Sequence, residues 1–219
     1  MNTDSRKPFQ MPQKPAAISD IAYDALQLAA LSSRMALEER TLVNHVTGRP
    51  ENVAEHSSML TIVGPAIAEK YYPQLDANLV CSFTAIHDAV EAYVGDTPTH
   101  IISDHELKQK IEKEIRGLEL LKSDFSQFTH FVNFIEEYEN QKGPEARFVR
   151  VVDKWTPILL HFADKGATLR SYTSPDDLLA NYAPRAARLK EQFPDFVELV
   201  AVREELTKIA AMHLFASEE

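Results

Sequence analysis

Apolar side chains recur at steps of three and four residues along most of the chain, and this spacing places them on one face of an α-helix. The first such run extends from Ile18 to about Val46 and predicts one or two amphipathic helices. Few segments alternate apolar and polar residues as a half-buried strand would, and the chain has only 6 glycines for tight turns. The pattern therefore predicts an all-α fold of about seven to eight helices.

Two helix boundaries are marked by their end residues. Asn52 followed by Glu55 forms a capping-box pattern, so a helix should begin there with His56 in its first turns. Another helix is expected over Asp76–Tyr93, and it should stop near Gly95, where the composition becomes that of a loop.

A later helix is expected to open at Pro144 and to be disturbed near its middle. Pro157 has no N–H to donate to the carbonyl of Asp153, four residues back, so a kink is expected beside that aspartate. Residues 1–17 are polar and rich in proline, and we expect them to be a disordered tail. No repeat or linker interrupts residues 18–216, which we expect to form a single domain.

Charge and cysteine content limit the partners. The formal net charge is -10, which repels a phosphate backbone and argues against a nucleic-acid polymer. Small phosphorylated molecules are still possible ligands, because a bound cation and one or two arginines can reverse the local electrostatic field. The single cysteine, Cys81, lies in an apolar run and suits a cytoplasmic protein. We expect no membrane association, since no apolar segment approaches the length of a membrane span.

Histidine and carboxylate side chains are the residues of this sequence best suited to bind a metal ion. His87, Asp88 and Glu91 crowd one side of a helix, while His56 and Asp153 lie on two other expected helices. Three helices can therefore bring two imidazoles and two carboxylates to one divalent cation. This mixed donor set suits manganese, cobalt, iron or zinc better than magnesium.

Asp153 has independent support from its surroundings. It lies in the string VRVVDKWTP, where burying an aspartate among valines is costly unless it is coordinated, paired or hydrogen-bonded. The rival Asp164 lies in a segment typical of a helix end, where an exposed carboxylate is ordinary. Asp153 is therefore the stronger candidate ligand.

Two strings carry a resemblance to a known family. ENVAEHS, at residues 51–57, and HDAVEAYVGDTPT, at residues 87–99, resemble the corresponding segments of the HD-domain metal-dependent phosphohydrolases, and within them the YfbR-type bacterial 5'-deoxynucleotidases. The resemblance implies an all-α HD-domain bundle with a metal site between three helices. It also implies release of phosphate from (deoxy)nucleoside 5'-monophosphates, and a homodimer.

The resemblance assigns roles residue by residue. It makes the metal ligands His56, His87, Asp88 and Asp153. Glu91 would position or deprotonate the attacking water, and Asp96 would assist it or protonate the departing sugar oxygen. An upstream arginine grips the substrate phosphate in those enzymes, and Arg40 is the nearest match. A tryptophan that follows that arginine helps to exclude a ribose 2'-hydroxyl there, whereas this chain has Thr41. Arg49, beside the first string, is another candidate contact for the phosphate.

Other activities of the same fold remain open at this point. HD-type (deoxy)nucleoside triphosphate hydrolases and guanosine tetraphosphate hydrolases have a similar metal site but release tripolyphosphate or pyrophosphate. Di-iron HD oxygenases need further histidine or carboxylate ligands, for which no well-spaced set is present. A non-catalytic nucleotide sensor is disfavoured by the presence of Glu91 and Asp96.

Overall fold

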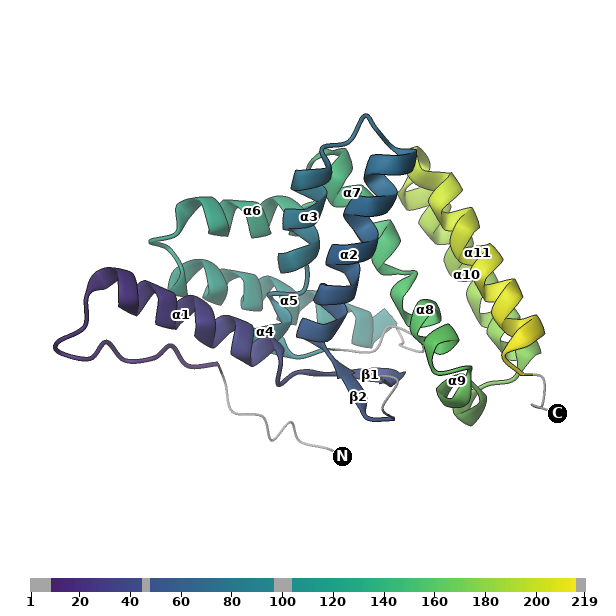
Figure 1. Cartoon of the computed structure of the whole chain (residues 1–219), viewed down its shortest axis with the longest axis horizontal. Coiled ribbons are helices and arrows are strands. Elements are labelled where there is room, and N and C mark those ends of the chain that lie inside the picture. Colours follow the sequence, from purple (N-terminus) through teal and green to yellow (C-terminus); the bar gives the residue numbers. More distant parts are fainter. Residues whose placement is uncertain (1–8, 45–47, 97–103, 216–219) are drawn as a thin grey trace.

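Regular structure in the computed structural model, which describes residues 9–44, 48–96 and 104–215, is almost entirely helical (Figure 1). In chain order the elements are α1 (Asp20–Met35), β1 (Glu39–Asn44), β2 (Pro50–Asn52), α2 (Val53–Tyr71), α3 (Ala77–Ile86), α4 (Glu91–Val94), α5 (Asp104–Asp124), α6 (Thr129–Glu139), α7 (Gly143–Asp153), α8 (Thr156–Ala163), α9 (Ala167–Tyr172), α10 (Pro175–Gln192), the 3-10 helix η1 (Pro194–Phe196) and α11 (Val197–His213). The expectation of an all-α fold is confirmed.

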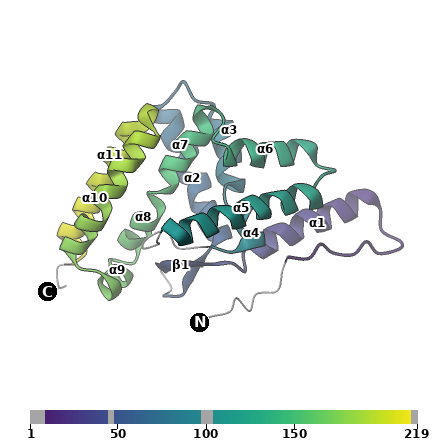
Figure 2. The ribbon, with the colours of Figure 1, turned by 180° about the vertical axis from the view of Figure 1, so that it is seen from behind.

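Helices α2, α3 and α7 occupy the centre of the molecule, and the other elements surround them on two sides (Figures 1 and 2). At one end α10 and α11 form an antiparallel pair beside α8 and α9. At the other end α1 and α5 run next to each other, with α6 beyond them. The short antiparallel ribbon of β1 and β2 lies at the start of α2. The central helices are therefore shielded at both ends.

Two large apolar cores hold these layers together in the described part of the chain, and a smaller apolar cluster lies between α8, α9 and α11. The first lies between the central helices and the α10–α11 pair, where the buried ring of Phe148 meets Tyr72 and Phe196 edge-on, at centroid distances of 5.4 and 5.8 Å. The second lies between α1, α4, α5 and α6, around the fully buried Phe125. Phe9, within the segment expected to be disordered, packs against Tyr93 of this second core. Residues 1–8 of that segment lie outside the described residues.

The first apolar run does not form helix throughout. α1 ends at Met35, and residues 39–44 instead pair as a strand with residues 50–52. The string ERTLVN contains β-branched residues, which pack well in an extended strand. A backbone hydrogen bond of 2.9 Å from Val53 to Glu38 fastens the ribbon to the beginning of α2. Residues 45–47, where the expected helix would have ended, lie outside the described residues.

The expected helix over residues 76–93 is divided into α3 and α4. Asp76 caps α3 by accepting from the backbone of Asn78, as a helix start at this position requires. The chain then tightens, with hydrogen bonds from Ala89 to Ile86 and from Glu91 to Asp88 that reach back three residues instead of four. Within the described part of the chain, no helix is long and apolar enough to cross a membrane.

Candidate metal centre

His56 is carried to the centre by the first turns of α2. The capping box at the start of this helix is complete, with Asn52 Oδ1 accepting from the backbone of Glu55 at 2.9 Å and Glu55 Oε2 accepting from the backbone of Asn52 at 3.2 Å. The cap fixes the direction of the first turns, and the His56 side chain is fully buried as a result. The expectation for this helix start is confirmed.

His87 and Asp88 occupy the tight turn between α3 and α4. On a regular α-helix adjacent side chains diverge by about 100°, and the tightened turn allows both to face the same point. The Nδ1 atom of His87 lies 2.9 Å from the carbonyl oxygen of Thr84. Because a carbonyl only accepts, Nδ1 carries a proton, and Nε2 is the His87 atom that faces the cluster and can coordinate a cation.

Asp153 is the last residue of α7, and its side chain extends into the cluster. The helix stops there because Pro157 cannot donate to the carbonyl of Asp153, and the hydroxyl of Thr156 donates to that carbonyl instead, at 2.7 Å. The disturbance expected beside Asp153 is therefore a full break between α7 and α8. The Asp153 carboxylate is buried, and its Oδ2 accepts from Lys154 Nζ at 2.6 Å.

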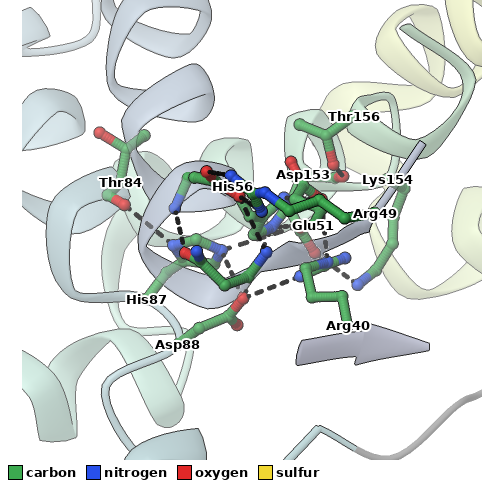
Figure 3. A network of polar contacts seen from close by, with 12 residues as sticks. Arg40, Arg49, Glu51, His56, Thr84, His87, Asp88, Asp153, Lys154 and Thr156 are labelled. Atoms are coloured by element: carbon green, nitrogen blue, oxygen red, sulfur yellow. Dashed lines mark hydrogen bonds and ion pairs between the residues drawn. The ribbon is translucent and has the colours of Figure 1, made fainter. Parts of the chain in front are cut away.

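These four side chains converge from three segments (Figure 3). Asp153 Oδ1 lies 2.9 Å from His56 Nε2 and 3.8 Å from His87 Nε2. Asp88 Oδ2 lies 3.0 Å from His87 Nε2 and 3.4 Å from His56 Nε2. Ligand atoms of His56, His87 and Asp88 all fall within 4.8 Å of one another, which is compatible with one shared cation. Two imidazole nitrogens and two carboxylate oxygens thus face a common centre.

The electrostatics of the cluster fit a cation. Burial opposes ionisation of Asp88, yet His87 and His56 hold its pKa below the ordinary value. Burial likewise opposes ionisation of Asp153, and Lys154 and His56 hold its pKa well below the ordinary value. His87 Nε2 is buried and makes no hydrogen bond of good geometry with the described residues. Ionised carboxylates beside an unsatisfied imidazole nitrogen are the donor set that a divalent transition metal prefers.

Arg40 is brought beside this cluster by β1. Its Nη1 lies 3.1 Å from Asp88 Oδ2, and its Nε lies 3.3 Å from Glu51 Oε2. Burial lowers the pKa of Arg40, but the carboxylates of Asp88 and Asp153 outweigh burial and raise it. Arg40 is therefore a permanent positive charge at the edge of the cluster.

The sequence also predicted four other site residues, which are Arg49, Thr41, Glu91 and Asp96. Arg49 is half exposed and ion-paired with Glu55, so the structure does not bring it into the cluster of ligand atoms. Thr41 belongs to β1, but its side chain lies outside the described residues. Glu91 starts α4, and burial, Asp88 and Asp96 together raise its pKa well above the ordinary value. Asp96 follows Gly95, whose positive φ of 76° ends α4 and turns the chain.

Sequence reasoning missed two charged residues here. Glu51 is almost completely buried, with Oε2 lying 3.9 Å from His56 Nδ1, behind the ring and opposite the cluster. Burial, with Asp153 and other nearby carboxylates, raises the pKa of Glu51 to about 7 even though Arg40 opposes the shift. Lys154 neutralises the outer oxygen of Asp153. Two features of the sequence point to them: Lys154 directly follows the buried Asp153, and Glu51 lies within the first motif string.

Comparisons with known proteins agree with this geometry. The family model described as HD domain matches residues 36–194. The chain is 27% identical over 135 residues to 5'-deoxynucleotidase hdd1 of Schizosaccharomyces pombe, a match that covers 59% of this chain and 67% of that protein. It is 28% identical over 113 residues to human 5'-deoxynucleotidase HDDC2, covering 51% of this chain and 53% of that protein. The chain thus matches between about half and two thirds of the length of these relatives.

A solved structure shares the fold. The crystal structure of a predicted metal-dependent phosphohydrolase from Magnetospirillum magnetotacticum MS-1 superposes with a TM-score of 0.66 at 22% identity, covering 87% of this chain and 95% of that one. The HD-domain model alone matches well over half of the sequence and includes every residue of the His–Asp cluster. The resemblance inferred from the two motif strings is confirmed, and the chain belongs to the HD domain family.

Proposed function

We propose that this protein is a metal-dependent phosphohydrolase that removes phosphate from (deoxy)nucleoside 5'-monophosphates. The observation that carries the proposal is the convergence of His56, His87, Asp88 and Asp153 on one buried centre. The names of the curated relatives, which are 5'-deoxynucleotidases, support the choice of substrate.

The four converging side chains would hold one divalent cation. Such an ion, when bound, supplies charge stabilisation for phosphoryl oxygens and lowers the pKa of a coordinated water. His56 Nε2, His87 Nε2, Asp88 Oδ2 and Asp153 Oδ1 are the donor atoms. Behind His56, Glu51 Oε2 lies 3.9 Å from Nδ1, on the side of the ring away from these donor atoms.

Glu91 and Asp96 would handle the protons. Glu91 Oε2 is buried and has no hydrogen-bond partner among the described residues, so it is available to the attacking water. The water adds its oxygen to phosphorus, the bond from phosphorus to the sugar 5'-oxygen breaks, and that oxygen takes up a proton as the nucleoside leaves. Asp96, close enough to raise the pKa of Glu91, is the second carboxyl group for this exchange.

Arg40 would bind the substrate phosphate. Its guanidinium lies against Asp88 at the edge of the centre and can offer further N–H donors to phosphate oxygens. Arg49 has its guanidinium engaged by Glu55 and is the weaker candidate. With Thr41 in place of the bacterial tryptophan, we expect weaker discrimination between deoxyribose and ribose.

A product panel tests the proposal. Deoxynucleoside and ribonucleoside mono-, di- and triphosphates would be incubated with manganese, cobalt or magnesium and assayed for phosphate, pyrophosphate and tripolyphosphate. We expect phosphate from the monophosphates, loss of turnover in Glu91→Gln with metal still bound, and unchanged turnover in the surface control Glu119→Gln. Tripolyphosphate or pyrophosphate as the product, or full turnover by Glu91→Gln, would overturn the proposal. A cytoplasmic location and a homodimer remain predictions, the second of which light scattering tests.

A further inference from the structure

A cavity of about 390 Å³ lies between α1 and α2. The end of α3, the turn that follows it and α6 complete its walls. Figure 1 shows α1 and α6 on the same side of the central helices α2 and α3. Pockets that hold small molecules in proteins measure about 300–1,000 Å³, so this cavity is large enough for a small ligand.

Short side chains on α2 leave the cavity open. Ala54, Ser57 and Thr61 follow one another at steps of three and four residues, so they form a single stripe along the helix. Leu31 and Met35 belong to the stripe of α1 that lines the opposite wall. The α2 side chains do not reach across the space between the two stripes, and protein interiors rarely leave a void of this size without an occupant.

One polar atom in the wall of the cavity is unsatisfied. Ser57 is only 5% exposed, and its hydroxyl has no hydrogen-bond partner among the described residues. The neighbouring hydroxyl of Thr61 is satisfied, since it donates to the Ser57 carbonyl at 2.8 Å. A buried hydroxyl without a partner is costly, so a ligand that forms a hydrogen bond with Ser57 would remove this cost.

The cavity is separate from the metal centre, although both are built on α2. Adjacent side chains of an α-helix diverge by about 100°, so Ser57 faces the cavity while His56 faces the cluster. In the turn after α3, Ala89 lines the cavity directly after Asp88. A ligand in the cavity would therefore leave the proposed metal ligands free and would contact the residues next to two of them.

The lining of the cavity defines the chemistry of its ligand. None of the described residues around it is charged, so a neutral molecule is favoured over an ion. The ring of Phe131 and the sulfur of Met35 are groups that pack well against an aromatic ring. We propose that this cavity is a second binding site, which takes a small neutral aromatic molecule whose hydroxyl group forms a hydrogen bond with Ser57.

Fluorine NMR titration with 4-fluorophenol and with fluorobenzene tests this site. The two probes differ only in the hydroxyl group, and both are neutral at pH 7. The titrations are run in EDTA without nucleotide, so their result does not depend on the proposed phosphohydrolase activity. We expect wild-type protein to bind 4-fluorophenol about threefold to tenfold more tightly than fluorobenzene, and Ser57→Ala to bind the two probes with affinities within about twofold of each other.

Ala85→Leu blocks the cavity from its exposed edge. Ala85 lines the cavity but is itself exposed, so the larger side chain carries little folding risk and should weaken 4-fluorophenol binding by about tenfold or more. Ala187→Leu, at an exposed position of α10, is the matched control and should leave the affinity within about twofold. Absence of saturable 4-fluorophenol binding, equal affinities of wild type for the two probes, or equal affinities of Ala85→Leu and Ala187→Leu for 4-fluorophenol would overturn the proposal.

Discussion

Replacing Asp153 with asparagine should remove most of the stabilisation that a divalent metal gives to the folded protein. A ligand that binds only the folded state stabilises it by about 2.7 kcal/mol when its free concentration is 100 times the dissociation constant. For a chain of this length, each kcal/mol moves the melting temperature by about 2–4 °C. Wild-type protein in manganese should therefore melt about 5–11 °C higher than in EDTA.

Asp153→Asn keeps the shape of the side chain but removes the charge that His56 and Lys154 surround. If metal affinity falls about 100-fold, the same manganese concentration gives only about 0.4 kcal/mol, a shift of about 1 °C. Differential scanning fluorimetry in EDTA and in manganese measures both proteins directly.

Asp164→Asn is the matched control for this experiment. Its carboxylate caps backbone amides of residues 166 and 168 after α8, so the variant should lose some stability in EDTA. It should nevertheless keep the full manganese shift, because Asp164 is not part of the cluster. A full shift in Asp153→Asn, or loss of the shift in Asp164→Asn, would refute the assignment of Asp153.

Three further predictions concern stability. Phe148→Ala leaves a cavity between the rings of Tyr72 and Phe196 and should lower the free energy of unfolding by about 3–5 kcal/mol in urea titration; a loss below about 1 kcal/mol contradicts this packing. Asn52→Ala removes the cap of α2 and should cost about 0.5–2 kcal/mol by the same assay, and an unchanged midpoint would argue against the capping box. Burial raises the pKa of Glu139 from 4.5 to about 7, so the folded state binds the proton more tightly and stability from this group falls as pH rises between these values. Glu139→Gln should therefore gain stability relative to wild type from pH 4.5 to 7.5, by at most about 3 kcal/mol, and a constant difference across this range would disprove the shift.

The sequence predicted those parts of the site that depend on contacts between residues close together in the chain. The capping box at Asn52 and Glu55 is a contact between neighbours in sequence, so the start of α2 and the placement of His56 follow from the string itself. The break after Asp153 likewise follows from the missing N–H of Pro157.

The parts that the sequence did not predict depend on contacts between distant segments. The apolar spacing that suggested a helix through residue 46 is compatible with a strand, and pairing with residues 50–52 decided between them. That ribbon brings Arg40 to Asp88, 48 residues later in the chain. The burial of Glu51 and the contact of Arg203 with Lys154 also arise only from packing, and periodicity carries no information about them.

An anomalous-difference map from a crystal grown with manganese tests the central claim most directly. We predict one strong peak within coordination distance of His56 Nε2, His87 Nε2, Asp88 Oδ2 and Asp153 Oδ1. A crystal with manganese at saturating concentration and no peak among these four atoms would contradict the account.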